Sequence, residues 1–329
     1  MAADPPGPDT APGAAARRGT GGQAAAGDVI MGREPLPSAL PAPELLSVII
    51  PARDAAALLP GQLAALSRQD HTGSWEVIVA DNGSTDDTAA TALRWADRLP
   101  GLRVVAASAR PGINHARNIG AGTARGDVLV FCDADDTATP GWLRAMARAA
   151  GTAHLVGGYP APYTTANHHA RSWRTPQPRD RLPVALDYLP FAMGCSLGVR
   201  TDVYHALGGF DEGYAGGGDE VEFCWRALLA DYTLAYAPDA VMRYRLRERL
   251  GPLVRQAYGY GVGNARLMRD FRVHGLPAVA PAEAARTWLR LLRRLPELAD
   301  REQAGRWCFD TAFRVGRLNG SVRYRVPCL

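Results

Sequence analysis

Short apolar segments alternate with helical segments between Ser47 and Cys132, and this alternation is the feature that most constrains the fold. The apolar segments have the length and flanking polar residues of buried strands, and they are 47–51, 75–80, 103–106 and 128–132. The segments between them have helical spacing or capping residues, and they are 58–69, 85–97 and 114–124. Strands and helices joined by short links predict an α/β fold with a doubly wound, mainly parallel sheet flanked by helices.

Carboxylates follow the last of these strands at Asp133, Asp135 and Asp136. Open α/β sheets bind ligands at the carboxyl ends of their strands. Two carboxylates separated by one residue, Asp133 and Asp135, offer the oxygen ligands that a hard divalent cation such as Mg²⁺ or Mn²⁺ prefers. The alternative is that these residues are cap and turn residues before a helix that starts near Pro140.

The ends of the first two strands carry a second group of polar residues. It consists of Pro51, Arg53, Asp54, Asp81, Asn82 and Gly83. If these strands are adjacent and parallel, their ends lie together, where Asp81 can accept the imide N–H of a uracil or thymine ring. Gly83 would allow the backbone to approach a nucleoside closely. An ordinary turn is the alternative for this segment.

Two further clusters have the residue types that a transfer site needs. Arg117 lies in the predicted helix 114–124, where it can brace a diphosphate or the aspartates; otherwise it is a solvated helix residue. Three glycines, 216–218, precede Asp219 and Glu220 at the start of a predicted helix 219–229. Such a loop can carry a carboxylate into a cleft as a general base, or the acids can simply cap the helix.

Charge is distributed unevenly along the chain. All 37 basic residues are arginine. The region from Arg243 to the end contains 18 of them but only 7 acidic residues. This basic region has no base-reading pattern, so no nucleic acid is expected. It predicts either a solvated helical cap or peripheral docking to the anionic inner face of a membrane.

Cysteine usage and hydropathy bear on location. The five cysteines lack the paired spacing of a disulfide framework or zinc site, which favours a cytoplasmic protein. No apolar run has the ~18 to 20 residues that a bilayer-spanning helix needs, and a signal-peptide pattern is not apparent.

The motifs also occur in the order typical of one enzyme family. They are Ser-Val-Ile-Ile-Pro (47–51), Val-Ile-Val-Ala-Asp-Asn-Gly-Ser-Thr-Asp-Asp-Thr (77–88), Ala-Arg-Asn-Ile-Gly (116–120), Val-Phe-Cys-Asp-Ala-Asp-Asp (130–136), Gly-Gly-Phe-Asp-Glu (208–212) and Gly-Asp-Glu-Val-Glu-Phe-Cys-Trp-Arg (218–226). Over residues 47–245 the chain therefore resembles the family 2 glycosyltransferases. The resemblance implies a GT-A fold, a nucleotide-diphosphate sugar donor, a divalent metal ion (Mn²⁺ or Mg²⁺) and transfer with inversion at the anomeric carbon.

The resemblance also implies roles for individual residues. Asp81 matches the base-binding aspartate and Arg117 the basic residue near the diphosphate. Asp133 and Asp135, which flank Ala134, match the metal and donor-sugar pair, with Asp135 as the direct ligand. The family's sugar and acceptor cleft corresponds to Gly194, Ser196 and Asp211, although a turn role for Asp211 is an equal alternative.

Two departures from the family pattern concern the base and the metal. The usual Glu-Asp pair is reversed to Asp219-Glu220, so the base is placed on Glu220 with Asp219 as the alternative. Many members have a metal-binding histidine after the last strand, whereas this chain has Met242-Arg243-Tyr244-Arg245. Arg243 or Arg245 is therefore expected to contact the donor phosphates.

These observations predict three regions: a disordered segment 1–44, a GT-A catalytic domain 45–242 and a helical, basic extension 243–329. The nucleotide-binding half would be about 45–137 and the acceptor half about 138–242, with 152–200 forming loops and edge strands. The predicted activity is metal-assisted, inverting transfer of a sugar, with UDP- or dTDP-sugars as favoured donors. The acceptor is a hydroxyl or amine of a small-molecule, glycan or lipid-linked compound.

Other functions compete with this one. A sugar-nucleotide pyrophosphorylase is less favoured, because it would need a glycine-rich loop after the first strand, where this chain has Pro51-Ala-Arg-Asp. A dinucleotide oxidoreductase fails similarly, because Gly259-x-Gly261-x-Gly263 follows no convincing strand. A glycosyltransferase-like binding or scaffold protein without turnover is the non-enzyme alternative, which the reversed pair and the missing histidine favour.

Overall fold

The computed structural model describes residues 40–278 and 280–327. Most of the segment predicted to be disordered, 1–39, lies outside the described residues. Its last residues, 40–44, are held by hydrogen bonds, since the Leu40 amide donates to the Gly151 carbonyl (3.1 Å) and the Glu44 amide to Asp127 Oδ1 (3.1 Å).

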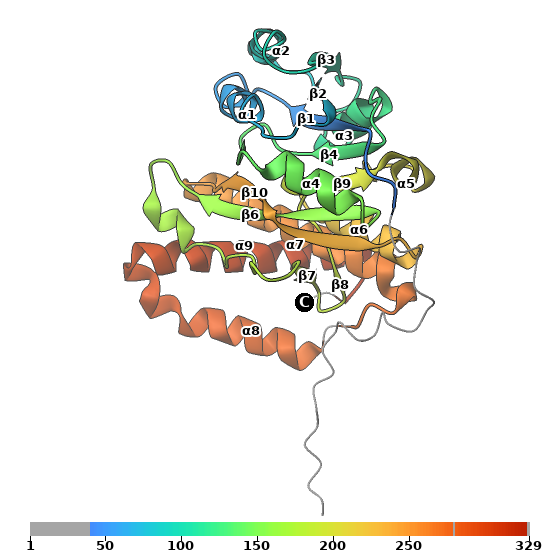
Figure 1. The fold of residues 1–329 in the computed structure, drawn as a ribbon. Helices are drawn as coiled ribbons and strands as arrows, with labels where there is room; N and C mark the ends of the chain where they lie inside the picture. The colour runs from blue at the N-terminus through green and yellow to red at the C-terminus, as the bar shows by residue number, and fades with distance from the viewer. Residues whose placement is uncertain (1–39, 279, 328–329) are drawn as a thin grey trace, which may run out of the picture. The chain divides into compact units, whose positions relative to one another are not determined.

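An eight-stranded sheet forms the centre of the fold (Figure 1). Its strands, in spatial order, are β3 (Arg103–Ala106), β2 (Ser74–Asp81), β1 (Leu45–Ala52), β4 (Val128–Phe131), β9 (Leu197–Arg200), β6 (Leu155–Tyr163), β10 (Leu234–Arg245) and β5 (Thr137–Ala138). The first four strands are mutually parallel, and β6 is parallel to β10, whereas β9 is antiparallel to both of its neighbours. The predicted mainly parallel α/β fold is confirmed.

Helices cover both faces of this sheet because its central strands are apolar on both sides. In β1, Val48 and Ile50 pack into one core cluster, whereas Ile49 between them packs into the other, as strand alternation requires. The first cluster receives side chains from α1 (Leu59–Leu66), α2 (Thr88–Leu93) and α4 (Trp142–Ala150), and the second from α3 (Ile113–Gly122), α5 (Thr201–Ala206) and α6 (Asp219–Leu229).

The prediction of edge strands within 152–200 was wrong for β6 and β9. Both lie inside the sheet, between β4 and β10. Pro160 and Pro162 suggested an edge strand, because proline has no backbone N–H to donate to a neighbouring strand. In the structure β9 pairs only with Leu155–Gly157 of β6, so both prolines lie beyond that pairing. A separate small sheet, β7 (Val184–Ala185) and β8 (Leu189–Pro190), follows β6.

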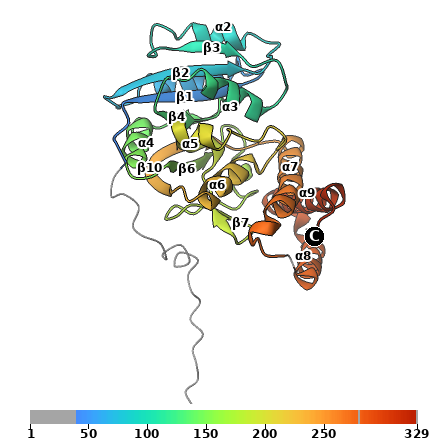
Figure 2. The same ribbon diagram turned by 90° about the vertical axis from the view of Figure 1, so that its right-hand side faces the viewer.

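The C-terminal extension consists of α7 (Leu250–Phe271), α8 (Pro281–Arg293) and α9 (Arg301–Tyr324). Helices α7 and α9 lie side by side (Figure 2). A Cβ atom on Gly261 of α7 would collide with the backbone of α9 at Phe313, and one on Gly316 of α9 with the backbone at Tyr258. The two backbones therefore approach closely at these glycines. In the part of the chain that the structure describes, no helix is long and apolar enough to cross a bilayer.

A buried glutamate, Glu76, links several strands by hydrogen bonds at the end of the sheet that lies away from Asp133 and Asp135. The Glu76 side chain is 2% exposed and accepts hydrogen bonds from Ser47 Oγ (2.8 Å), Arg103 Nη1 (2.6 Å), and Arg125 N (2.9 Å) and Nε (2.8 Å). Burial alone would raise the pKa of Glu76, but the hydrogen bonds from Arg103, Arg125 and Ser47 outweigh it and lower the pKa to about 2.

Candidate active site

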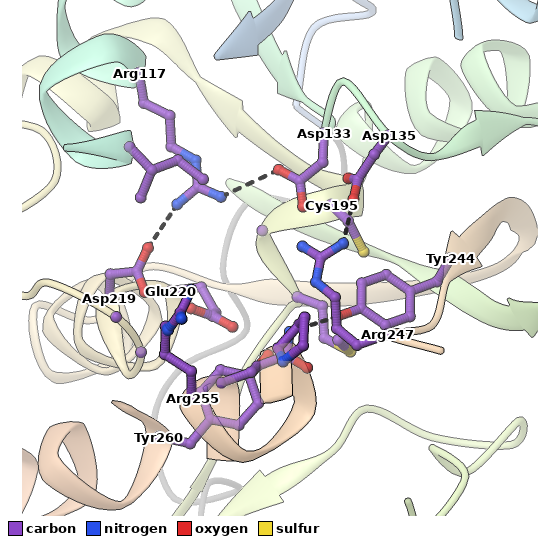
Figure 3. A pocket seen from close by; sticks show the side chains of 17 residues that line it. Arg117, Asp133, Asp135, Cys195, Asp219, Glu220, Tyr244, Arg247, Arg255 and Tyr260 are labelled. Atoms are coloured by element: carbon purple, nitrogen blue, oxygen red, sulfur yellow. Dashed lines mark hydrogen bonds and ion pairs between the residues drawn. The ribbon is translucent and has the colours of Figure 1, made fainter. Parts of the chain in front are cut away.

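A polar cleft of about 440 Å³ lies at the carboxyl end of β4. Its charged walls come from five parts of the chain: the end of β4, α3, the start of α6, the segment after β10, and α7 (Figure 3). The charged residues among its lining are Arg117, Asp133, Asp135, Asp219, Glu220, Arg247 and Arg255. A concave site in which acids and arginines converge is suited to a charged ligand and to proton transfer.

Asp133 and Asp135 both line this cleft, in contrast to Asp136. Asp133 Oδ1 is buried without a hydrogen-bond partner, its nearest cation being Arg117 Nη2 at 3.6 Å. Burial raises the pKa of Asp133, and Arg117 opposes that shift. Asp135 Oδ2 is 2.5 Å from Arg247 Nη1. Asp136 is turned into the protein, where Oδ1 accepts a hydrogen bond from the Arg245 amide (2.8 Å).

The Asp133 and Asp135 pair fits a divalent cation as two of its ligands. The evidence is the unpartnered, buried Oδ1 of Asp133 beside a second carboxylate in the same cleft. Within residues 40–278 and 280–327, no group of at least three His, Cys, Asp or Glu side chains has the arrangement of a metal site. A divalent cation there would need further oxygen ligands besides these two carboxylates.

Arg117 is a buried cation that joins α3 to α6. Its Nη1 donates to Asp219 Oδ2 (2.6 Å) and to Asn114 Oδ1 (3.2 Å), and its Cζ lies 5.0 Å from the centre of the Phe210 ring. A Cβ atom on Gly194 would lie 2.5 Å from Arg117 Nη2, which is too close. Glycine at 194 therefore leaves the space that the guanidinium occupies.

The glycine loop before α6 is held against α7. Gly217 and Gly218 have φ angles of 146° and 84°, a region that side chains disfavour. A Cβ on Gly263 of α7 would collide with the Gly217 carbonyl, and one on Gly259 with the Gly216 carbonyl. The spaced glycines of α7 thus serve close packing, and this packing positions the first turn of α6 with Asp219 and Glu220.

Glu220 is a carboxylate whose acidity is weakened by its surroundings. Burial, and then the neighbouring charge of Asp219, raise the pKa of Glu220 well above its ordinary value, while Arg117 opposes the shift. A carboxylate with a raised pKa is a stronger proton acceptor once it is ionised, as a general base must be.

Comparison with known proteins identifies the family. The family model for glycosyl transferase family 2 matches residues 47–208. Glycosyltransferase AglE of Haloferax volcanii is 30% identical over 230 residues, which cover 68% of this chain and 73% of that protein. The chain belongs to the family 2 glycosyltransferases. Validoxylamine A glucosyltransferase of Streptomyces hygroscopicus subsp. jinggangensis is 31% identical over 58% of this chain and 53% of its own length.

Solved structures share the fold of this glycosyltransferase. The mannosyltransferase PcManGT of Pyrobaculum calidifontis, in complex with GDP-Man and Mn²⁺, aligns with a TM-score of 0.55 and 19% identity over 84% of this chain and 87% of that one. S. aureus TarS 1–349 in complex with UDP-GlcNAc aligns with a TM-score of 0.51 and 16% identity over 85% and 92%. At these identities the likeness concerns the fold.

The residues predicted to bind the nucleoside lie together at the ends of β1 and β2, outside the lining of the glycosyltransferase cleft. Asp54 Oδ1 accepts hydrogen bonds from Thr85 N (2.7 Å) and Oγ1 (3.0 Å). Asp81 Oδ1 accepts from Ser84 Oγ (2.5 Å), and the Asn82 amide group donates to the Arg110 carbonyl (2.8 Å). Pro51 is buried in β1, Arg53 is exposed and Gly83 has a φ of 70°. The bonds of Asp54 join the two strand ends, and a nucleoside role for these residues stays a prediction.

The other predicted site residues divide into two groups. Gly194 lines the cleft together with Arg117, Asp133, Asp135, Asp219 and Glu220. Five others do not line it. Ala134 is buried, and Ser196 Oγ accepts a hydrogen bond from Trp142 Nε1 (2.9 Å). Asp211 forms an ion pair with Arg266 (2.6 Å). The Arg243 guanidinium lies over the ring of Tyr163, and the Arg245 amide donates a hydrogen bond to Asp136.

Several cleft residues were not predicted. Arg247 follows β10, and Arg255, Gln256 and Tyr260 come from α7, which the sequence suggested to be a cap. The four-residue spacing of Pro252, Gln256 and Tyr260 was a usable signal, because residues four apart share one face of a helix. For Arg247 there was no such signal, since the strand pattern ends at Arg245.

Proposed function

We propose that this glycosyltransferase moves a sugar from a nucleotide-diphosphate sugar to a hydroxyl or amine of its acceptor, with inversion at the anomeric carbon. UDP- and dTDP-sugars are the favoured donors, because Asp81 resembles the base-binding aspartate of the family. The observation that carries the proposal is the cleft in which Asp133 and Asp135 lie opposite Glu220, with arginines between them (Figure 3).

The donor half of the proposed site consists of carboxylates and arginines. Asp133 and Asp135 would hold a divalent cation, either Mn²⁺ or Mg²⁺, with Asp135 as the direct ligand. When bound, that cation would offset negative charge on the donor diphosphate. Arg247 and Arg255 line the same cleft. Their guanidinium groups would bind the departing diphosphate. Arg117 instead fixes Asp219 and thereby the first turn of α6.

Glu220 is the proposed general base. It would take the proton of the acceptor hydroxyl or amine while the acceptor atom forms a bond to the anomeric carbon. The bond from that carbon to the diphosphate oxygen breaks at the same time, and its electron pair leaves with the nucleotide. One displacement inverts the anomeric carbon and requires no covalent enzyme intermediate. Asp219 is the less favourable base, because its carboxylate already accepts a hydrogen bond from Arg117.

One relative bears on the chemical class of the acceptor. Validoxylamine A glucosyltransferase is named for a small-molecule acceptor, and it is 31% identical over 223 residues. For this chain a small-molecule, glycan or lipid-linked acceptor therefore remains the proposal. A cytoplasmic location and a peripheral membrane contact through the basic extension also stay predictions. Salt-sensitive pelleting with anionic liposomes tests that contact.

Donor hydrolysis and donor binding test the proposed function together. UDP-, dTDP- and GDP-sugars are screened with and without Mn²⁺, by thermal shift for binding and by release of the nucleotide diphosphate for turnover. We expect stabilisation and slow hydrolysis with one donor class. Binding without hydrolysis or transfer for every donor would instead favour the binding or scaffold alternative.

A further inference from the structure

A second cavity, of about 370 Å³, adjoins the active-site cleft. The two share three lining residues, Met193, Glu220 and Tyr260. Glu220 therefore borders both the cavity that contains Asp133 and Asp135 and a cavity that contains neither. A base that deprotonates the acceptor has to border the acceptor site, and that site has to adjoin the donor cleft for transfer. The second cavity meets both conditions, because it borders Glu220 and adjoins the cleft.

The wall of this second cavity has an apolar and aromatic part beside polar residues such as Thr175, Gln177 and Asn264. The apolar and aromatic part comes from the residues near β7 and β8 and from helices α6 and α9, and it includes Val184, Leu186, Phe191, Val221, Phe309 and Phe313. Aliphatic and aromatic walls bind the apolar part of a ligand by removing its surface from water. The C-terminal helix α9 thus builds part of the cavity through Phe309 and Phe313.

Arg174 supplies a positive charge to the same cavity. Its Cζ lies 5.5 Å from the ring centre of Tyr244, 5.6 Å from that of Tyr260 and 5.5 Å from that of Phe309. Its Nη1 donates to Tyr244 Oη (3.2 Å) and to Gln256 Oε1 (3.5 Å). Among the described residues no carboxylate lies within ion-pair distance of Arg174, although other arginines near the cleft, such as Arg117 and Arg247, have one.

Within the described part of the chain, the charge of Arg174 therefore has no carboxylate as an ion-pair partner. Arg174 is partly buried. Arginine stays protonated in proteins, and removing a cation from water is costly unless an anion or hydrogen-bond acceptors compensate it. The aromatic rings, the Tyr244 hydroxyl and the Gln256 side-chain oxygen compensate it only in part, because none of them carries a full negative charge. An anionic group in the cavity would complete the pairing.

We propose that the second cavity binds the acceptor, and that this acceptor has an apolar or aromatic body and an anionic group that pairs with Arg174. The inference rests on the proposed role of Glu220 and adds the chemical class of the acceptor. Two sources share this chemistry, a lipid phosphate and an aromatic carboxylate.

Binding of matched probes to the full chain tests the inference. The anionic probes are farnesyl phosphate and 4-hydroxyphenylacetate, and their neutral counterparts are farnesol and methyl 4-hydroxyphenylacetate. Affinities are measured by tryptophan fluorescence or calorimetry. We expect at least one anionic probe to bind about 10- to 100-fold more tightly than its neutral counterpart, the range of a charged hydrogen bond. The probe that binds identifies the source.

Variants separate the contribution of the Arg174 charge to probe binding from that of the apolar side chains. Arg174→Gln should remove the preference for the anionic probe, and Arg174→Lys should retain part of it. Phe313→Ala should weaken the anionic and neutral probes alike. Arg171→Gln is the control, because Arg171 is an exposed arginine nearby that does not line this cavity. Thermal melting checks that each variant is folded.

Two outcomes would overturn the inference. One is that neither anionic probe binds to the wild-type protein, and the other is that Arg174→Gln binds them as the wild type does. Donor binding is measured in the same samples. If donor binding and hydrolysis persist in either case, the proposed transferase function stands while the acceptor class is wrong.

Discussion

Arg117 donates a 2.6 Å hydrogen bond to Asp219 Oδ2, across 102 residues of sequence. This bond engages Asp219 from α3, whereas the adjacent Glu220 borders both cavities of the site. The two acids of the reversed pair therefore have different environments. Asp219 is the anchor of the α6 first turn, and Glu220 is the carboxylate available to a substrate.

Replacing Glu220 with Gln is expected to lower kcat by roughly 10²- to 10⁴-fold, the usual contribution of a general base. The change removes the proton acceptor but keeps the size of the side chain, so the affinity for the donor should be nearly unchanged. Single-turnover kinetics and calorimetry measure the two quantities. A Glu220→Gln enzyme with wild-type turnover would rule out this assignment.

Replacing Asp219 with Asn is expected to act differently. The change removes the charged partner at 2.6 Å and leaves Asp133, at 3.6 Å, as the nearest carboxylate of buried Arg117. We expect the fold to be destabilised by about 3 kcal/mol, the lower end for a broken buried pair. Thermal or denaturant unfolding measures this change, with Glu220→Gln as the matched control. If Asp219→Asn retained full stability and donor affinity but lost turnover, the base would be Asp219.

The pH dependence of activity should report the raised pKa of Glu220. A base acts in its ionised form, so kcat/KM should rise with pH along a limb well above the ordinary glutamate pKa of about 4.3. Because Asp219 contributes to the upward shift, Asp219→Asn should move that limb to lower pH. A limb at the ordinary glutamate value, unmoved in the variant, would contradict the assignment.

Asp135 and Arg247 form an ion pair of 2.5 Å, and their variants should have opposite effects on a cation. Asp135→Asn is expected to abolish Mn²⁺ binding and to lower turnover by roughly 10²-fold or more, with the fold preserved. Arg247→Ala should strengthen Mn²⁺ binding in the absence of donor, because a competing cation is removed from Asp135, while weakening the donor by about 10- to 100-fold.

Calorimetric titration with Mn²⁺ measures this effect without any assay of activity. Arg243→Ala is the control, since Arg243 stacks on Tyr163 and does not line the cleft. Unchanged Mn²⁺ affinity in both arginine variants would show that Arg247 does not compete for Asp135.

The buried Glu76 should make the stability of the fold sensitive to acid. Its pKa is lowered to about 2 in the folded protein, so the folded state binds fewer protons than the unfolded chain at mildly acidic pH. The stabilisation is thus present above the unfolded pKa of about 4.5 and is lost as pH falls from there toward 2. Glu76→Gln should lower the free energy of unfolding at pH 7 by roughly 3 kcal/mol and flatten this dependence. Denaturant unfolding at several pH values measures both effects.

Local patterns were sufficient for much of the fold and for part of the site. The apolar run 128–132 predicted β4 to within one residue, and helix α6 begins and ends as predicted, at Asp219 and Leu229. The position of β6 in the sheet was predicted wrongly from local patterns. Its proline content suggests an edge strand, whereas its place in the sheet depends on pairing with β9 and β10. Local patterns also failed for α7, whose role as a wall of the cleft depends on where the helix packs.

The sequence by itself determined the alternation of strands and helices and the positions of Asp133, Asp135, Asp219 and Glu220 along it, because hydrophobic period and capping act over a few residues. Only the tertiary structure decided which charges meet. Arg117 reaches Asp219 across 102 residues, Arg247 reaches Asp135 across 112, and Arg174 lies among aromatic rings from β10, α7 and α9. Such contacts depend on how whole elements pack, which no local period encodes.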